Sequence, residues 1–389
     1  MRHVIGLMAA VYVLLVPMNV IAQGTEQSVP AELPINIISD EYGTAKVVTI
    51  YREIRDTIAG YDHLTQKLRL HILSGPGTGK EFDADHGMLR GQEYGKLNVD
   101  DVVTIQTITQ SNGVVRHMIH DMYRLPAIGW LLVVFALLCV FLGGIRGFTS
   151  IVGLFASIGI LFAFVVPVIA AGYDPLTISV VGSYAIACTS MYLAHGFNKR
   201  TSVALLSTCI TLALAALTAF LSVYAAKLFG MGSEESMYLM TGQFSGINLR
   251  GLLIGGCIIG ALGVLDDVTT AQTAGIDELT KANPSMTFID LYNSGMSIGR
   301  EHIASLINTL ALAYVGASLP LMLLFRQDGN LPVWLVLNGE FIAQEIVRTL
   351  IGSTALLLAV PIATWCAAYF LKNKTGSRLP AGTGHIHIH

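Results

Sequence analysis

Uncharged, apolar windows of membrane-spanning length constrain this chain more than any other feature. They lie at residues 127–145, 147–173, 175–198, 201–226, 251–265, 303–325 and 349–371. The hydrocarbon core of a bilayer is about 30 Å thick, so a helix needs about 20 apolar residues to cross it. The short window 251–265 reaches this length only if it includes Arg250 at one end, or Asp266 and Asp267 at the other. The windows therefore predict an all-α membrane bundle of about seven helices over residues 125–372.

Charge divides the chain into two parts. Residues 23–126 hold 24 charged residues, whereas the much longer stretch 127–389 holds the same number. Only 13% of all residues are charged, compared with about 25% in a soluble domain, which excludes a soluble enzyme. The net charge is −3, and no basic run is longer than Lys199-Arg200. Nucleic acid is therefore excluded as a partner, because its phosphates need a basic surface.

The chain begins with a segment that is typical of an exported protein. Residues 1–22 carry Arg2 ahead of a long apolar run, which indicates either a cleaved signal peptide or an uncleaved signal anchor. Residues 23–45 are polar and contain Pro30 and Pro34, which predicts a flexible lead-in. Both interpretations of the first segment place the polar domain outside the cytoplasm.

Residues 46–124 have the pattern of a small β domain. Strand-like alternation occurs at residues 46–51, 63–73, 101–109 and 113–120, between clusters of glycine, proline and aspartate. Several short strands in about 80 residues favour a β-barrel-like domain of OB or SH3 size.

Basic residues give the orientation of the membrane helices. With the β domain outside, eight lysines and arginines fall on the inner side and three on the outer side. The inner set is Arg146, Lys199, Arg200, Lys281, Arg300, Lys372, Lys374 and Arg378, and the outer set is Lys227, Arg250 and Arg326. Cytoplasmic loops carry an excess of Lys and Arg. We therefore expect an extracytoplasmic β domain and a cytoplasmic tail at residues 373–389.

No cofactor is predicted. All five cysteines lie in apolar stretches, which excludes a disulfide framework, and no CxxC motif occurs. Residues 74–81 resemble a phosphate-binding loop, but the glycine spacing is wrong and Glu81 follows Lys80. Metal binding has only a weak candidate in the terminal histidines His385, His387 and His389.

Two adjacent carboxylates form the strongest candidate site. A helix rises 1.5 Å per residue, so if Arg250 lies at the outer boundary, Asp266 lies about 24 Å along the axis, within the inner leaflet or just at its edge. Carboxylates at that depth normally face protein, water or an ion. Adjacent helical residues point about 100° apart, so Asp266 and Asp267 cannot share one direction. They are either an ion or proton site or simply the charged inner end of the helix.

We expect a second polar helix to meet these aspartates. His302, Ser305 and Asn308 follow one another along a helix that would pack antiparallel to the first. Together with Asp266 and Asp267, they form the candidate transport or ion site. The alternative is a set of interhelical hydrogen bonds that only hold the bundle together.

Glu345 and Arg348 are spaced i, i+3 near the predicted outer end of the last span, so they can form an ion pair on one helix face. An ion pair at the outer interface is one interpretation, and gating or substrate contact is the other.

The segments Arg250–Asp267, Asn283-Pro284, Ser294–Met296, Ile298–Arg300 and Asn308–Pro320 resemble the bacterial YibE/F-like membrane protein family. Glu345–Ser353 through Pro361 resembles its last helix, and Leu73–Gly75 with Gly79-Lys80 resembles its β domain. The likeness covers roughly residues 45–371. It implies a multi-pass protein of the bacterial plasma membrane with an extracytoplasmic N-terminal domain, and it supplies no reaction.

Two functions remain open from the sequence. The first is a transporter or permease for a small solute or ion that uses the inner-leaflet aspartates. The second is a membrane scaffold or signalling protein whose outer β domain binds an envelope component or a protein partner. An enzyme that acts on lipid ranks third, because no nucleophile–base pair stands out.

Overall fold

The computed structural model describes residues 37–58, 61–89, 95–110, 113–242, 244, 246–320, 322–323 and 332–372. These residues form two units, with the division at Leu137. The predictions for residues 1–22, for the first part of the lead-in, for the tail at 373–389 and for His385, His387 and His389 lie outside the described residues.

The first unit is a five-stranded antiparallel sheet that curves into a half-barrel. Its strands are β1 (Ile37–Ile58), β2 (Tyr61–Ser74), β3 (Glu81–Leu89), β4 (Val102–Gln110) and β5 (Val115–Met122), in the order β3-β2-β1-β4-β5. The register of β1 against β2 shifts between Val47 and Thr49 and again between Ile50 and Arg52. Such bulges bend a strand and increase its twist. The half-barrel confirms the β domain, and its OB-like or SH3-like character stays a prediction.

Apolar side chains on one face of the sheet make a separate core. This core consists of Ala45, Val47, Leu68, Leu70, Ile72, Leu97, Val103 and Ile105. Across the opening of the half-barrel, the rings of Phe82 on β3 and His117 on β5 lie 4.9 Å apart. Partial burial and the nearby Lys80 lower the pKa of His117, because both disfavour the imidazolium.

The strand boundaries correct the sequence prediction in two places. Strand β1 begins at Ile37, so it includes residues that were assigned to the flexible lead-in. Strand β3 was not predicted at all. The loop that resembled a phosphate-binding motif is the β2–β3 turn, in which Gly75, Gly77 and Gly79 have φ of 96°, 83° and 84°. Positive φ explains these glycines as turn residues.

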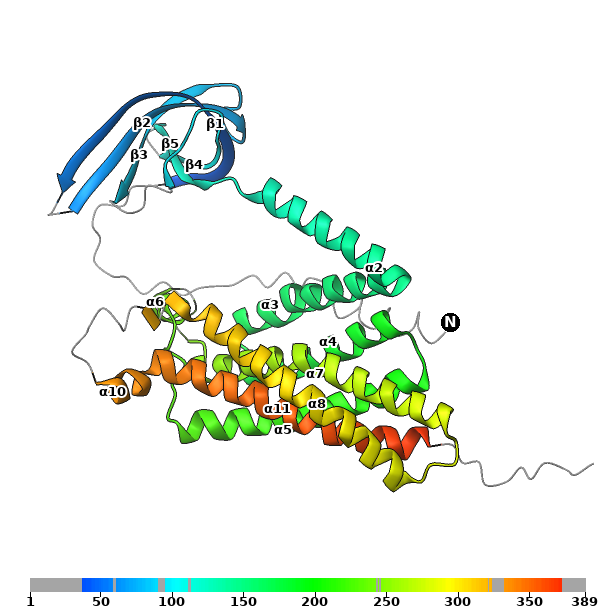
Figure 1. Ribbon diagram of the computed structural model, residues 1–389. Coiled ribbons are helices and arrows are strands. Elements are labelled where there is room, and N and C mark those ends of the chain that lie inside the picture. Colours follow the sequence, from blue (N-terminus) through cyan, green and yellow to red (C-terminus); the bar gives the residue numbers. More distant parts are fainter. Residues whose placement is uncertain are drawn as a thin grey trace, which may run out of the picture. The chain divides into compact units, whose positions relative to one another are not determined.

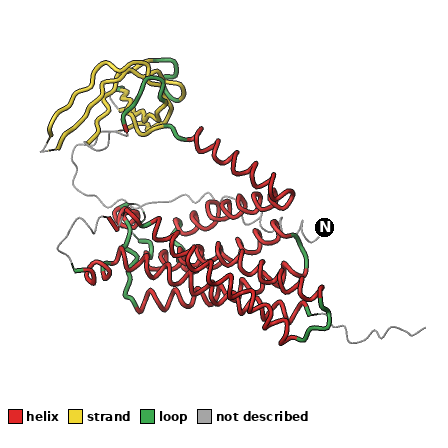
Figure 2. The backbone as a smooth tube through the Cα atoms, in the orientation of Figure 1, coloured by secondary structure: helices red, strands yellow, loops and turns green. Residues whose placement is uncertain are grey.

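The second unit is helical (Figures 1 and 2). It contains α2 (Leu125–Ile160), the π-helix η2 (Leu161–Val165), α3 (Val166–Ala170), α4 (Pro175–His195), α5 (Lys199–Ala225), α6 (Glu234–Thr241), α7 (Leu249–Ala282), α8 (Phe288–Ala317), α10 (Val333–Asn338) and α11 (Glu340–Leu371). Helix α2 starts in the first unit and continues into the second. The long helices α4, α5, α7, α8 and α11 run side by side (Figure 1).

Five helical stretches of the described chain are long and apolar enough to cross a membrane. They are Leu125–Ala170, Pro175–His195, Lys199–Ala225, Leu249–Ala282 and Glu340–Leu371. The predicted window 127–145 and all but the last three residues of 147–173 fall in the first stretch, which breaks sharply at Gly144 with φ 58° and ψ −139°. The window 303–325 begins inside α8. The bundle is thus confirmed as helical, and the count of seven spans stays a prediction.

Side-chain caps fix where these helices begin. At the start of α4, the Asp174 carboxylate accepts a hydrogen bond from the backbone N–H of Thr177. At the start of α5, the Asn198 amide oxygen accepts one from the backbone N–H of Thr201. Asn248 caps α7 in the same way. The α4–α5 connection is short, so the end of α4 and the start of α5 lie together. This arrangement concentrates polar groups at one end of the bundle.

Candidate functional site

Helices α4 and α7 pack closely enough to place their small polar residues against each other. Gly255 on α7 faces Ser179 on α4, and a Cβ atom at Gly255 would overlap the Ser179 side chain. Gly251, one turn earlier, lies against the backbone of Leu176. The glycines therefore allow the two helices to approach each other, as the small-xxx-small spacing indicates.

Asp266 lies farther along the same helix contact. Its Oδ2 accepts a hydrogen bond of 3.2 Å from the Ser190 hydroxyl of α4. Its Oδ1 is buried and has no hydrogen-bond partner within the described part of the chain. A buried polar atom without a partner carries a desolvation cost of about 1–3 kcal/mol, more when the group is charged. The second carboxylate oxygen can therefore accept a proton, a cation or a water molecule.

Hydroxyl groups join α7 to α5 on the next helix face. The Thr208 and Thr269 hydroxyls are 2.6 Å apart, and both side chains are fully buried. One turn on, Gln272 donates to the backbone oxygen of Gly295 and to the Thr364 hydroxyl. These contacts connect α7 to α5, α8 and α11, so the helix that carries Asp266 is held on several sides.

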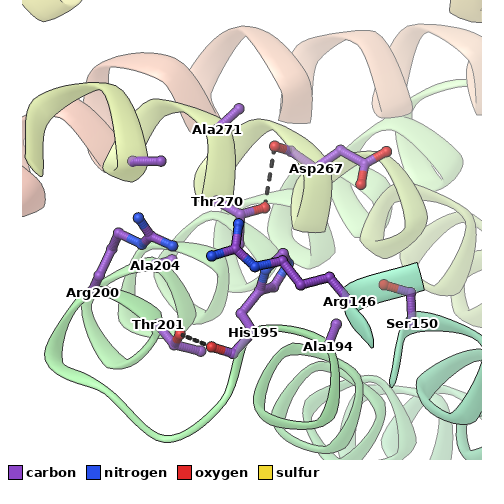
Figure 3. A pocket seen from close by; sticks show the side chains of 11 residues that line it. Arg146, Ser150, Ala194, His195, Arg200, Thr201, Ala204, Asp267, Thr270 and Ala271 are labelled. Carbon is purple, nitrogen blue, oxygen red and sulfur yellow. Dashed lines mark hydrogen bonds between the residues drawn. The ribbon is translucent and has the colours of Figure 1, made fainter. Parts of the chain in front are cut away.

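A cavity of about 370 Å³ opens at the same end of the bundle. Its lining comes from α2, α4, α5 and α7. The residues are Arg146, Ser150, Ala194, His195, Arg200, Thr201, Ala204, Asp267, Thr270, Ala271 and Ala274. Figure 3 shows the guanidinium groups of Arg146 and Arg200 extending toward each other across it. The cavity and the Asp266–Ser190 contact thus share α4 and α7.

The two adjacent aspartates have different surroundings. Asp266 is half-buried against α4, whereas Asp267 is exposed and lines the cavity. In Figure 3 the Asp267 carboxylate points away from the two guanidinium groups. This divergence follows from the angle of about 100° between adjacent helical residues.

The structure does not bring the predicted α8 residues together with these aspartates. His302, Ser305 and Asn308 are exposed, and no hydrogen bond or ion pair found in the described ranges joins them to Asp266 or Asp267. The buried face of α8 carries Leu291, Gly295 and Gly299 instead. A Cβ atom at Gly295 would meet Ile276 and Thr364, and one at Gly299 would meet Val360. Packing through these small residues turns the polar face of α8 away from Asp266.

Glu345 and Arg348 form the expected ion pair on α11. The Arg348 Nη1 and Glu345 Oε1 atoms are 2.9 Å apart. The Arg348 Nε is buried without a partner in the part of the chain that the structure describes. Their location at the outer interface stays a prediction.

Sequence reasoning missed four residues of this region, namely Arg146, Ser190, His195 and Arg200, as members of a site. One signal was available, because Arg146 and Arg200 were both assigned to the inner side of the bundle. Ser190 had no such signal, since it lies far from Asp266 in the sequence. In the described ranges, no group of three or more His, Cys, Asp or Glu residues forms a metal site.

The comparisons with known proteins concern the helical unit. Residues 131–373 match the family described as YibE/F-like protein. No curated protein and no solved structure matches the chain. The match starts at residue 131, so the likeness of the β unit to that family stays a prediction. With well over half of its length matched, the chain belongs to the YibE/F-like protein family.

Proposed function

We propose that this membrane protein is a transporter for a small solute or ion, in which Asp266 binds a cation or exchanges a proton. The proposal rests on the surroundings of the Asp266 carboxylate. It lies in a helix long enough to cross a membrane, holds one hydrogen bond from Ser190, and has a second oxygen buried without a partner in the described structure. A charge at such a depth costs about 2.5–3.5 kcal/mol on insertion scales, so it requires compensation.

The polar groups of α4 support a path to this carboxylate. Ser179, Ser183 and Ser190 are spaced by four and seven residues, so they share one helix face. Ser179 and Ser183 are 2% and 0% exposed, and the Ser183 hydroxyl has no partner in the described chain. We call these three serines and Asp266 the polar seam. Hydroxyls inside a bundle are suited to relay protons or to coordinate small cations.

The orientation belongs to the same proposal. The excess of Lys and Arg on one side supports a β unit outside the cytoplasm and a C-terminus inside, in the bacterial plasma membrane. Asp266 and the cavity then lie at the cytoplasmic end. A cation bound there would exchange with the cytoplasm.

The direct test compares Asp266→Asn with Asp267→Asn. Asparagine has nearly the same shape as aspartate but has no charge, so the change removes the cation site with little change in packing. The purified full chain is placed in liposomes, and the influx of protons and of radiolabelled sodium is measured under imposed gradients. We expect the Asp266 variant to lose at least 90% of the protein-dependent flux, and the Asp267 variant to keep most of it, because Asp267 is exposed.

Three results would count against parts of this proposal. Flux that is equal in both variants and the unsubstituted chain would exclude Asp266 as the site and leave transport itself standing. Wild-type liposomes that are no faster than empty ones would remove the support for ion movement. Loss of a cellular phenotype only on deletion of residues 23–124 would favour the alternative, in which the β unit binds an envelope or protein partner and the bundle is its anchor.

A further inference from the structure

We infer that the cavity between α2, α4, α5 and α7 binds a small oxyanion, a phosphate or carboxylate group, through Arg146 and Arg200. The two guanidinium groups extend toward each other from different helices, and His195 lies beside them on the wall of the cavity (Figure 3). Guanidinium groups carry a rigid fork of N–H donors that fits carboxylate and phosphate oxygens.

The fold brings these cations together. The break at Gly144 ends the first part of α2 just before Arg146. The Thr149 hydroxyl then donates to the Ala194 backbone oxygen over 3.3 Å, which holds this part of α2 against α4. The short connection from His195 to Arg200 places the start of α5 on the opposite wall. Like charges repel, so their convergence needs a compensating anion.

The described side chains of the protein supply little of that compensation. Arg146 has no ion pair or side-chain hydrogen bond within the described ranges. Arg200 lies 3.9 Å from Asp277, but Lys281 holds the same carboxylate oxygen at 2.7 Å. Asp267 is the only acidic residue of the lining, and its carboxylate points away from the guanidinium groups. The wall between α2 and α5 is therefore strongly positive.

Hydrogen-bond donors and the helix field add to the two cations. Thr201 lies in the first turn of α5, a helix of 27 residues whose N-terminal end opens on the cavity. The N-terminus of a helix carries a partial positive charge and attracts anions. Ser150 contributes a hydroxyl to the lining, whereas the Thr270 hydroxyl already donates to the backbone oxygens of Asp266 and Asp267. A volume of about 370 Å³ is within the range of about 300–1,000 Å³ that holds small organic ligands.

Two sources can supply this chemistry. One is a free solute that carries a phosphate or carboxylate group. The other is the headgroup of an anionic phospholipid, since basic pockets between membrane helices bind such headgroups. Both sources use the same contacts to Arg146 and Arg200.

The test follows thermal unfolding of the purified full chain. In a neutral detergent, sodium phosphate is titrated against sodium chloride at constant ionic strength. In nanodiscs, phosphatidylglycerol is compared with phosphatidylcholine. A ligand that binds only the folded state stabilises it by RT ln(1 + [L]/Kd), so the unfolding midpoint keeps rising with ligand concentration above Kd. We expect the midpoint to rise in this way with phosphate, to be higher in phosphatidylglycerol than in phosphatidylcholine, or both.

Matched variants assign the rise to the cavity. Arg146→Gln and Arg200→Gln should each raise the phosphate Kd fitted from the midpoints about tenfold or more, or abolish the phosphatidylglycerol effect, because each removes charge-assisted hydrogen bonds. Lys199→Gln is the control, since it removes the same charge beside Arg200 from an exposed residue outside the lining. Arg146→Lys keeps the positive charge but lacks the forked N–H donors of the guanidinium group. Its response to phosphate should lie between that of Arg146→Gln and that of the unsubstituted chain.

The outcomes separate this inference from the proposed function. A phosphate effect points to a free solute, and a phosphatidylglycerol effect alone points to a lipid headgroup. Equal responses in Arg146→Gln, Lys199→Gln and the unsubstituted chain, or no response to either anion, would overturn the site. Asp266→Asn should leave the anion response intact even if it abolishes ion flux, so each idea can fail without the other.

Discussion

Gln66 illustrates how one buried side chain can hold a segment that has no regular structure. It is fully buried on β2, and its amide makes two hydrogen bonds with the backbone of Leu97, at 2.9 and 3.0 Å. It also donates to Glu53, which pairs with Lys96 at 2.7 Å. The Lys96 hydrogen bond holds the pKa of the Glu53 carboxyl below its ordinary value. The segment before β4 is thereby attached to β1 and β2.

Gln66→Leu should release this segment. The change leaves both backbone groups of Leu97 without partners, at a cost of about 2–3 kcal/mol. In the full chain we expect tryptic cleavage at Lys96 to become about tenfold faster or more, as measured by the appearance of the corresponding fragments. Gln106→Leu is the control, because the Gln106 amide donates to the exposed Asp40 carboxylate and, among the described residues, to no backbone group. Unchanged cleavage in the Gln66 variant would show that other contacts hold the segment.

At the scale of residues, the sequence predicted that Arg146 and Arg200 lie at the same end of the bundle, but it did not predict the side-chain contacts inside the bundle. The placement of Asp266 and Asp267 on different faces follows from helix geometry alone. The Ser190–Asp266 contact does not, because it joins helices separated by α5 and α6 in the chain. The exposure of His302, Ser305 and Asn308 depends on which face of α8 can pack, and that face is set by Gly295 and Gly299.

Among the helices, α7 shows most clearly how glycine determines packing. Gly255 and Gly263 are both helical, yet their surroundings differ. A Cβ atom at Gly255 would overlap Ser179, whereas one at Gly263 would have no neighbour within 4 Å. An alanine has a helix propensity about 1 kcal/mol better than glycine, so packing alone decides the sign of the two substitutions.

Gly255→Ala should therefore lower the thermal midpoint of the full chain, since overpacking typically costs about 1–3 kcal/mol. It should also displace α4 and weaken the Ser190–Asp266 contact. Gly263→Ala should leave the midpoint unchanged or raise it. The two midpoints are compared in the same detergent, and a Gly255 variant as stable as the Gly263 variant would show that α4 and α7 do not pack as described.

Helices and strands could be predicted where a continuous run of residues carried a clear pattern. The apolar windows gave the helices, because a membrane-spanning helix needs a long run of uncharged residues. Strand β3 was missed although Phe82, Ala84 and His86 alternate with acidic residues, because aspartate and glycine are rare in strands. The break at Gly144 lies at the end of the first predicted window, but its geometry depends on a positive φ that no spacing reveals.

At the scale of the whole chain, the two units differ in what stabilises them. The β unit buries its own apolar core, in which all eight residues of the cluster are at most 1% exposed. The helical unit exposes many large apolar side chains, such as Phe141, Phe162 and Leu217. Exposed apolar surface of that extent is stable in lipid and not in water. The family match is confined to the second unit and the helix that leads into it.

A fragment of residues 37–124 should accordingly fold without the membrane helices. Its core is complete, and its ion pairs, such as Arg69–Asp83 and Lys46–Asp100, are all formed within the fragment. We expect a β-type far-UV spectrum and a single cooperative transition in urea, since small domains with one core unfold in one step. The edge strands β3 and β5 are both open to pairing, so the fragment is examined at low protein concentration. A spectrum without a cooperative transition would show that the half-barrel depends on the helical unit. The deletion of residues 23–124 would then no longer separate a binding role of the β unit from a structural one.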